Sequence, residues 1–123
     1  MKLHASGEDY LEVILVLQKK LGIVRSVDVA RHMEVTKPSV CHAVKTLRLG
    51  GFLTMGEDYC LHLTDIGREV AEKIYERHCF FTEQLIAAGV EPQVAEADAC
   101  RIEHIISDES FSRLKETAAQ AQD

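Results

Sequence analysis

The stretch EVTKPSVCHAVKTLRLGG, residues 34–51, decides the expected fold of the N-terminal half of this 123-residue chain. Thr36 is a suitable N-cap, Pro38 suits the first turn of a helix, and Gly50 and Gly51 end it. Apolar residues recur at helical spacing along one side of this segment, namely Val40, Ala43, Val44 and Leu47. The opposite side is polar and basic, so the stretch predicts a helix with one buried face and one exposed face.

The segments around this helix predict two preceding helices and a following hairpin. A first helix is expected to begin with a Ser6 cap and to end at Gly22, and a short second one to span residues 27–32 after a Ser26 cap. Residues 52–55 and 59–63 flank a short polar turn and predict two antiparallel strands. This order of elements is typical of a winged helix-turn-helix.

The rest of the chain predicts helices only. A long helix is expected from a Thr64 cap to about residue 88, where Gly89 and Pro92 interrupt it. Two further helices are expected at about residues 94–106 and 110–121. The predicted fold class is therefore mainly α with a small β-hairpin, and the chain divides within or just before the long helix.

Charge is distributed unevenly along the chain. The formal net charge is −6, from 14 Lys and Arg against 20 Asp and Glu, which argues against a purely electrostatic nucleic-acid binder. Residues 19–48 nevertheless hold seven basic and two acidic side chains, whereas residues 71–123 hold five basic and eleven acidic ones. This asymmetry indicates different roles for the two halves.

Composition and cysteine spacing favour a cytoplasmic protein. The N-terminus resembles no signal peptide, and no apolar run approaches the roughly 20 residues that cross a bilayer, so no membrane partner is expected. The cysteines stand about 20 residues apart without a C-x-x-C pair, which disfavours zinc ribbons and redox motifs. We expect free, small, buried thiols at Cys41, Cys60, Cys79 and Cys100.

The polar face of the residue 36–49 helix matches what the major groove of duplex DNA requires. Ser39 and His42 are placed to reach base edges, while Thr36, Lys37 and the helix N-terminus are placed to hold phosphate. The acidic tip Glu57-Asp58 of the hairpin is not expected to hold phosphate strongly. The candidate DNA-binding residues are Arg25, Thr36, Lys37, Pro38, Ser39, His42 and Lys45. The alternative is a solvated face on a small helical core.

A second pattern is typical of metal binding. Cys100, Glu103 and His104 stand at i, i+3 and i+4, which places a thiol, a carboxylate and an imidazole on one face of a helix. The competing interpretation is a packed Cys100 and an exposed Glu103. Asp9 and Glu12 also share a helix face, but from spacing alone the stronger interpretation is that Asp9 caps the helix and Glu12 is solvated. The chain has no H-E-x-x-H motif, so we expect neither an enzyme nor a small-molecule substrate.

These motifs together resemble the diphtheria-toxin-repressor family of iron- and manganese-dependent repressors, in its short two-domain form. The matching segments are residues 8–12, 35–40, 63–67, 77–78 and 98–108. The resemblance implies a DNA-binding domain at residues 1–70 and an all-α metal-binding and dimerisation domain at residues 71–123. It also implies metal ligands at Asp9, Glu12, His78, Cys100, Glu103 and His104. A lone histidine such as His78 would otherwise be interpreted as structural.

The implied function is repression of metal-homeostasis genes by a homodimer on a double-stranded DNA operator. Mn²⁺ or Fe²⁺ would be the corepressor, with Zn²⁺ or Co²⁺ able to bind in vitro. The ion would neutralise the ligand carboxylates, link the two halves and hold the recognition helices near ~34 Å apart. The alternative is a metal-independent winged-helix regulator that senses a small molecule or an oxidant through its cysteines.

The sequence departs from the family pattern at several positions. Asp9 matches the manganese-responsive members and Cys100 the iron-responsive ones, which leaves the metal open. Thr82 stands where the family often has Glu, with Glu83 one step round the helix, and Glu96 stands where iron-type members have an ancillary His. A second metal site is therefore open as well. The chain ends at residue 123, so the family's optional SH3-like third domain is expected to be absent.

Overall fold

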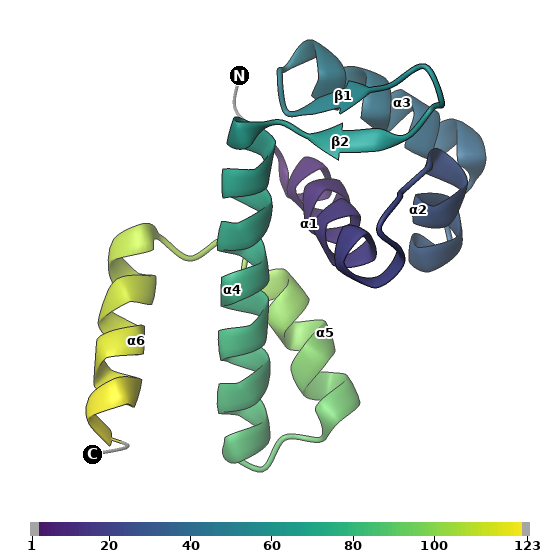
Figure 1. The fold of residues 1–123 in the computed structure, drawn as a ribbon. Helices are drawn as coiled ribbons and strands as arrows, with labels where there is room; N and C mark the ends of the chain where they lie inside the picture. Colours follow the sequence, from purple (N-terminus) through teal and green to yellow (C-terminus); the bar gives the residue numbers. More distant parts are fainter. Residues whose placement is uncertain (1–2, 122–123) are drawn as a thin grey trace. The chain divides into compact units, whose positions relative to one another are not determined.

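The computed structural model describes residues 3–121, which form two compact units, one ending at Lys73 and the other beginning at Ile74. Its elements (Figure 1) are α1 (Ala5–Leu21), α2 (Ser26–Met33), α3 (Lys37–Leu49), β1 (Leu53–Met55), β2 (Leu61–Leu63), α4 (Asp65–Ala87), α5 (Pro92–Ile102) and α6 (Asp108–Ala121). Helices with one small hairpin confirm the predicted fold class. The unit boundary falls inside α4, and the predicted domain division after residue 70 stays a prediction.

Local capping signals explain where the helices of the first unit begin. At α3 the Thr36 hydroxyl accepts a hydrogen bond from the Ser39 N–H at 3.3 Å, as the sequence predicts. At α2 the Asp28 carboxylate accepts from the Arg25 N–H at 2.9 Å. The predicted caps at Ser6 and Ser26 are wrong: α1 begins at Ala5 after His4, whose side chain makes no capping bond, and Ser26 is the first residue of α2 after the N-cap Arg25.

The hairpin packs on α1 and α3. Leu53 pairs with Leu63 and Met55 with Leu61 in an antiparallel register. The Leu61 N–H also donates to the Val24 carbonyl at 2.7 Å, which ties β2 to the segment before α2. The core of this unit includes the buried side chains of Leu11, Ile14, Leu15, Val24, Val29, Val40, Val44, Leu47, Leu53 and Leu61. This core leaves the polar face of α3 outside.

The turn of the hairpin uses its acidic residue internally. The Asp58 carboxylate accepts a hydrogen bond from the Cys60 N–H at 3.1 Å. That bond lowers the pKa of Asp58 below its ordinary value of 3.8. Tyr59 between them has φ of +64°, a left-handed conformation that suits a tight turn. The acidic tip therefore shapes the wing.

The junction between the hairpin and α4 depends on Gly67. Thr64 caps the helix by accepting from the Gly67 N–H at 3.1 Å, and its own N–H donates to the Phe52 carbonyl at 3.1 Å. A Cβ on Gly67 would lie 2.0 Å from that same carbonyl oxygen. Only glycine permits this close approach of helix and hairpin.

The second unit gathers α4, α5 and α6 around an aromatic core. Phe81 of α4, Ala99 of α5 and Phe111 of α6 are buried together, with Phe80 packed edge-on against both rings. The fifth helix is shorter than predicted, because α5 ends at Ile102 and residues 103–107 form a turn. Among the described helices none combines the length and apolarity needed to cross a membrane.

Candidate metal centre and nucleic-acid interface

The predicted DNA-binding residues lie on the surface of the first unit. The helix α3 buries Val40, Val44 and Leu47 and turns its polar side outward. The exposed residues include Arg25, Thr36, Lys37, Pro38, Ser39, His42 and Lys45. Cys41 was predicted to be buried, but it is exposed on the same helix. It stands four residues after Lys37 and therefore lies on the same polar face, so this spacing already indicated that Cys41 is exposed. This face has the shape and composition of a recognition helix.

Two basic residues that are separate in sequence line one cleft. Arg25, which precedes α2, and Lys37, which opens α3, both border a depression of about 440 Å³ next to the hairpin. Cys41, Asp58 and Tyr59 border it as well. Two helix N-termini and two cations there favour contact with a phosphate backbone, whereas Asp58 is already engaged by the Cys60 N–H.

In the second unit a buried carboxylate lies between two imidazoles. Glu103 has no solvent exposure, and its Oε2 lies 3.0 Å from Nδ1 of His78. Its other oxygen, Oε1, lies 3.4 Å from Nε2 of His104. Cys100 adds a thiol, with Sγ 3.6 Å from Nδ1 of His78. Helix α4 therefore supplies one candidate ligand, and the C-terminal end of α5 with its following turn supplies three.

These residues fit a divalent cation. Ligand atoms of His78, Cys100 and Glu103 lie within 4.8 Å of one another. Oε1 of Glu103 makes no hydrogen bond to any described residue, because the His104 nitrogen beside it is at ion-pair distance without hydrogen-bond alignment. A buried carboxylate oxygen without a donor is costly, and a bound cation removes that cost. Thiolate, imidazole and carboxylate together form a donor set for transition metals.

The competing interpretation of these three residues is wrong. It placed Cys100 in the packed interior and Glu103 in solvent, whereas the structure exposes Cys100 and buries Glu103 completely. The four cysteines are free thiols, as predicted, but only Cys60 is fully buried. Glu103 is instead an acidic residue buried beside two histidines.

The two candidate ligands of α1 belong to the first unit. Glu12 is buried with 9% exposure and Asp9 is partly buried, and each takes part in a polar or electrostatic interaction. Both lie on the same helix three residues apart, as expected from the sequence. Their role as metal ligands stays a prediction.

The residues considered for a second site are placed differently from one another. Oε1 of Glu96 lies 4.0 Å from Nε2 of His78, on the ring nitrogen that does not face Glu103. Thr82 has a buried hydroxyl with no hydrogen-bond partner among the described residues, while Glu83 is exposed. Of the three, Glu96 is the one brought next to a candidate ligand.

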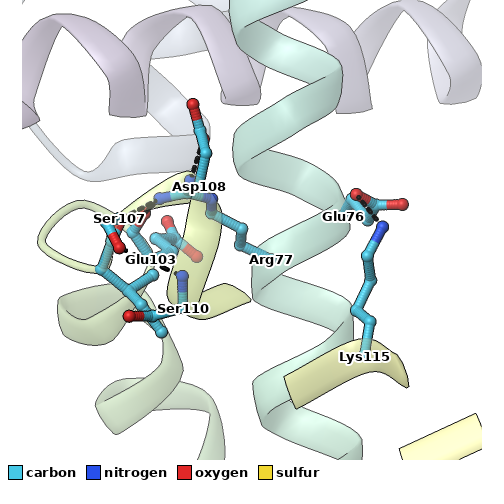
Figure 2. A network of polar contacts seen from close by, with 8 residues as sticks. Glu76, Arg77, Glu103, Ser107, Asp108, Ser110 and Lys115 are labelled. Carbon is cyan, nitrogen blue, oxygen red and sulfur yellow. Dashed lines mark hydrogen bonds and ion pairs between the residues drawn. The ribbon is translucent and has the colours of Figure 1, made fainter. Parts of the chain in front are cut away.

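Sequence reasoning missed Arg77, which is 4% exposed. Its Nη1 donates to the carbonyl oxygens of Glu103 at 3.2 Å and Ile106 at 2.6 Å, and its Nη2 donates to the Asp108 carboxylate (Figure 2). The signal was present in the helical period: Arg77 stands three residues after buried Ile74 on the inward face of α4. A charged residue at such a position requires internal partners.

Comparison with known families gives the decisive observation. Residues 2–59 match the N-terminal DNA-binding domain of iron-dependent repressors, and residues 64–122 match the metal-binding and dimerisation domain of the same proteins. The chain belongs to the iron-dependent repressor family. Its first unit is thus the family's DNA-binding region, and the helices that carry His78, Cys100 and Glu103 lie in its metal-binding and dimerisation region.

Individual relatives are transcriptional regulators, a non-enzymatic role. The chain is 32% identical over 108 residues to the transcriptional regulator MntR of Escherichia coli O6:H1, covering 88% of this chain and 70% of that protein. It is 30% identical over 115 residues to the HTH-type transcriptional regulator MJ0568 of Methanocaldococcus jannaschii, covering 89% and 90% of the two chains.

Solved structures share the fold. A crystal structure of the metal-dependent transcriptional regulator MtsR superposes with a TM-score of 0.84 at 25% identity, covering 92% of this chain and 53% of that one. A manganese-dependent transcriptional repressor in complex with manganese gives 0.80 at 25% identity, covering 90% and 51%. The chain spans about half the length of these solved structures.

Proposed function

We propose that this chain is a metal-responsive transcriptional repressor that binds operator DNA as a homodimer, with Mn²⁺ or Fe²⁺ as corepressor and metal-homeostasis genes as targets. The observation that carries the proposal is Glu103, a fully buried carboxylate between His78 and His104 with one oxygen lacking a hydrogen bond. The match of residues 64–122 to a metal-binding and dimerisation domain supports it.

The residues of the second unit offer different ligand atoms to a metal ion. Glu103 offers two oxygens, of which Oε2 lies 3.0 Å from His78 and Oε1 lies 3.4 Å from His104. Cys100 offers an exposed thiol at the rim, where exchange with solvent is easy. A bound divalent cation supplies the positive charge that the buried carboxylate lacks. We keep Asp9 and Glu12 as further proposed ligands because the segment 8–12 matches the family motif.

The first unit supplies the DNA-binding surface of the proposed repressor. Ser39 and His42 face outward on α3 to contact base edges, while Arg25 and Lys37 share a cleft suited to phosphate. Metal raises DNA affinity to the extent that the ligands bind the ion better in the DNA-competent state than in the others. The family's dimerisation region gives two such recognition helices per particle.

The candidate ligands differ in the metal ions that they prefer. The carboxylates favour hard ions such as Mn²⁺, and the thiol of Cys100 favours softer ions such as Fe²⁺, Co²⁺ and Zn²⁺. A manganese-dependent relative was solved with manganese, and a structure of another, ScaR, holds Zn²⁺. Replacement Cys100→Glu tests the balance: the ratio of Mn²⁺ to Zn²⁺ affinity, measured by competition with a fluorescent chelator, is expected to rise.

The proposal is tested by titrating DNA binding with metal. Duplexes selected from a random library with the metal-loaded protein are assayed by fluorescence anisotropy with Mn²⁺, Fe²⁺, Co²⁺ or Zn²⁺ under anaerobic conditions, and then with a chelator. Affinity that rises with Mn²⁺ or Fe²⁺ and collapses on chelation is expected. Equal affinity with and without metal would overturn the proposal, and loss of metal-free binding after mild oxidation would favour a thiol-based sensor.

A further inference from the structure

We infer that Arg77 is a positioning residue that sets the shape of the turn at residues 103–107, on which Glu103 and His104 are carried. The inference deepens the proposed function and rests on it, because the turn matters as the carrier of two metal ligands. Figure 2 shows the guanidinium reaching from α4 into this turn, with Glu103, Ser107 and Asp108 around it.

The Arg77 guanidinium donates hydrogen bonds mainly to main-chain carbonyl groups. One nitrogen, Nη1, donates to two carbonyl oxygens, those of Glu103 and Ile106, and Nη2 donates to the first carboxylate of α6, that of Asp108. The guanidinium carbon lies 5.3 Å from the centre of the Phe111 ring. Its remaining nitrogen, Nε, is buried without a hydrogen-bond partner among the described residues. A buried charge is costly unless it is compensated, and here the compensation comes from the carbonyl groups of the turn and from Asp108.

Arg77 also accounts for the end of α5. Had the helix continued as the sequence predicts, the carbonyl of Glu103 would accept from the N–H group four residues on. The Ile102 carbonyl still accepts from the Ile106 N–H, and also from that of Ile105, but the carbonyls of Glu103 and Ile106 accept from the guanidinium instead. Buried carbonyls at a helix end need such donors. A side chain from another helix thus terminates α5 at the candidate metal ligands.

Two consecutive residues of α4, Arg77 and His78, therefore contact the same residue, Glu103. Arg77 holds the main-chain carbonyl of Glu103, and His78 contacts its side-chain carboxylate at 3.0 Å. With backbone and side chain both fixed from α4, the carboxylate is oriented before a cation arrives. The planar guanidinium spreads five N–H donors over a fixed fork, whereas the lysine ammonium offers three donors from a single nitrogen, so lysine is not an equivalent replacement.

A second polar link between α4 and α6 provides the matched control. Nζ of Lys115 lies 3.2 Å from Oε1 of Glu76, the residue directly before Arg77 (Figure 2). Both partners are exposed, and neither touches the turn. Glu76→Gln therefore weakens a contact between the same two helices without disturbing residues 103–107.

The first test uses the full chain without metal, so it is independent of the proposed function. Amide hydrogen exchange is compared for the wild type, Arg77→Lys and Glu76→Gln. Arg77→Lys is expected to speed exchange in residues 103–107 selectively, and Glu76→Gln to leave that segment unchanged. Unchanged exchange, or an equal acceleration throughout residues 74–121, would overturn a positioning role. Should Arg77→Lys fail to fold, Asp108→Asn is measured, with a smaller acceleration in the same segment expected.

The second test uses Co²⁺ as a spectroscopic probe. Arg77→Lys is expected to weaken Co²⁺ binding by about 10–100-fold, the usual effect of losing a residue that orients ligands, and to alter the visible absorption spectrum at saturation. A wild-type affinity and spectrum in the folded variant would overturn the inference. Absence of Co²⁺ binding by the wild type would instead overturn the proposed function, while the exchange result would stand by itself.

Discussion

The exposed face of helix α3 and the turn after α5 both carry candidate functional residues, but they are built in opposite ways. On α3 the functional side chains are exposed neighbours on one regular helix, whose buried face is Val40, Val44 and Leu47. At the turn the central residue, Glu103, is fully buried and meets His78 from a helix 25 residues earlier. A surface of the first kind tolerates loss of single contacts, whereas a buried site depends on each member.

The largest expected effect is on metal binding by Glu103→Gln. The amide keeps an acceptor for His78 but removes the buried negative charge, so metal affinity should fall by more than the roughly 10–100-fold that loss of an orienting residue costs. Metal-dependent DNA binding should disappear with it, as measured by isothermal titration and anisotropy. In the metal-free protein the thermal midpoint should stay the same or rise, because a poorly compensated buried charge is gone.

The exposed Glu83 on α4 supplies the control for that variant. Glu83→Gln removes the same charge from a solvated position, and its metal affinity should equal that of the wild type. If Glu83→Gln and Glu103→Gln weakened metal binding equally, the contrast between a buried site and a tolerant surface would be lost.

A large effect on stability is expected from Gly67→Ala. The added Cβ would meet the Phe52 carbonyl oxygen at 2.0 Å, so helix and hairpin must separate, at a cost of roughly 1–3 kcal/mol in unfolding free energy. Gly22→Ala is the comparison, since its φ is +80° but nothing lies within 4 Å of the new Cβ. Denaturant unfolding should show the larger loss for Gly67→Ala, and the reverse order would contradict the close packing at this junction.

Single changes on α3 should have graded effects on DNA binding. His42→Ala should cost about 1–3 kcal/mol and relax sequence preference, whereas Lys45→Ala should weaken all duplexes similarly and lower the salt slope by about 1. Metal affinity should be unaffected by either. Arg113→Ala, which removes an exposed cation from α6, is the control and should leave DNA binding unchanged. Loss of all binding in Lys45→Ala would contradict a distributed surface.

The smallest effect is expected at the wing. The Cys60 N–H holds the pKa of Asp58 below 3.8, so the ionised carboxylate stabilises the turn above about pH 3.8 and loses this contribution as the pH falls through the lowered value. Asp58→Asn should therefore be slightly less stable than the wild type at pH 7. In thermal melts recorded from pH 7 downward, the two proteins should converge in acid, and a constant difference would assign the effect to packing.

Most of the first unit was predictable because its signals are local. The Thr36 cap, the helix end at Gly50 and the hairpin around residues 56–58 each depend on residues within one turn of one another. The exposed face of α3 followed from its period. The two wrong caps, at Ser6 and Ser26, lie at helix starts where the N-cap residue makes no side-chain capping bond, so the sequence carries no decisive signal there.

The second unit was predictable in its elements and less so in its site. Cys100, Glu103 and His104 were selected by helical spacing, yet the helix that justified the spacing ends at Ile102. Glu103 keeps helical backbone angles as the C-cap, which is why the pattern still identified it. The donor that ends the helix, Arg77, comes from another element, and no local rule includes it.

By itself the sequence determined the order of the elements, the exposed basic helix and the residue types of a metal site, because caps, period and motif act over a few residues. Only the tertiary structure decided which of those residues are buried. It exposed Cys100, buried Glu103 beside His78, and placed Arg77 on the carbonyl groups of the turn. Burial and long-range hydrogen bonds depend on segments distant in sequence, and they set the charge balance that makes the site fit a cation.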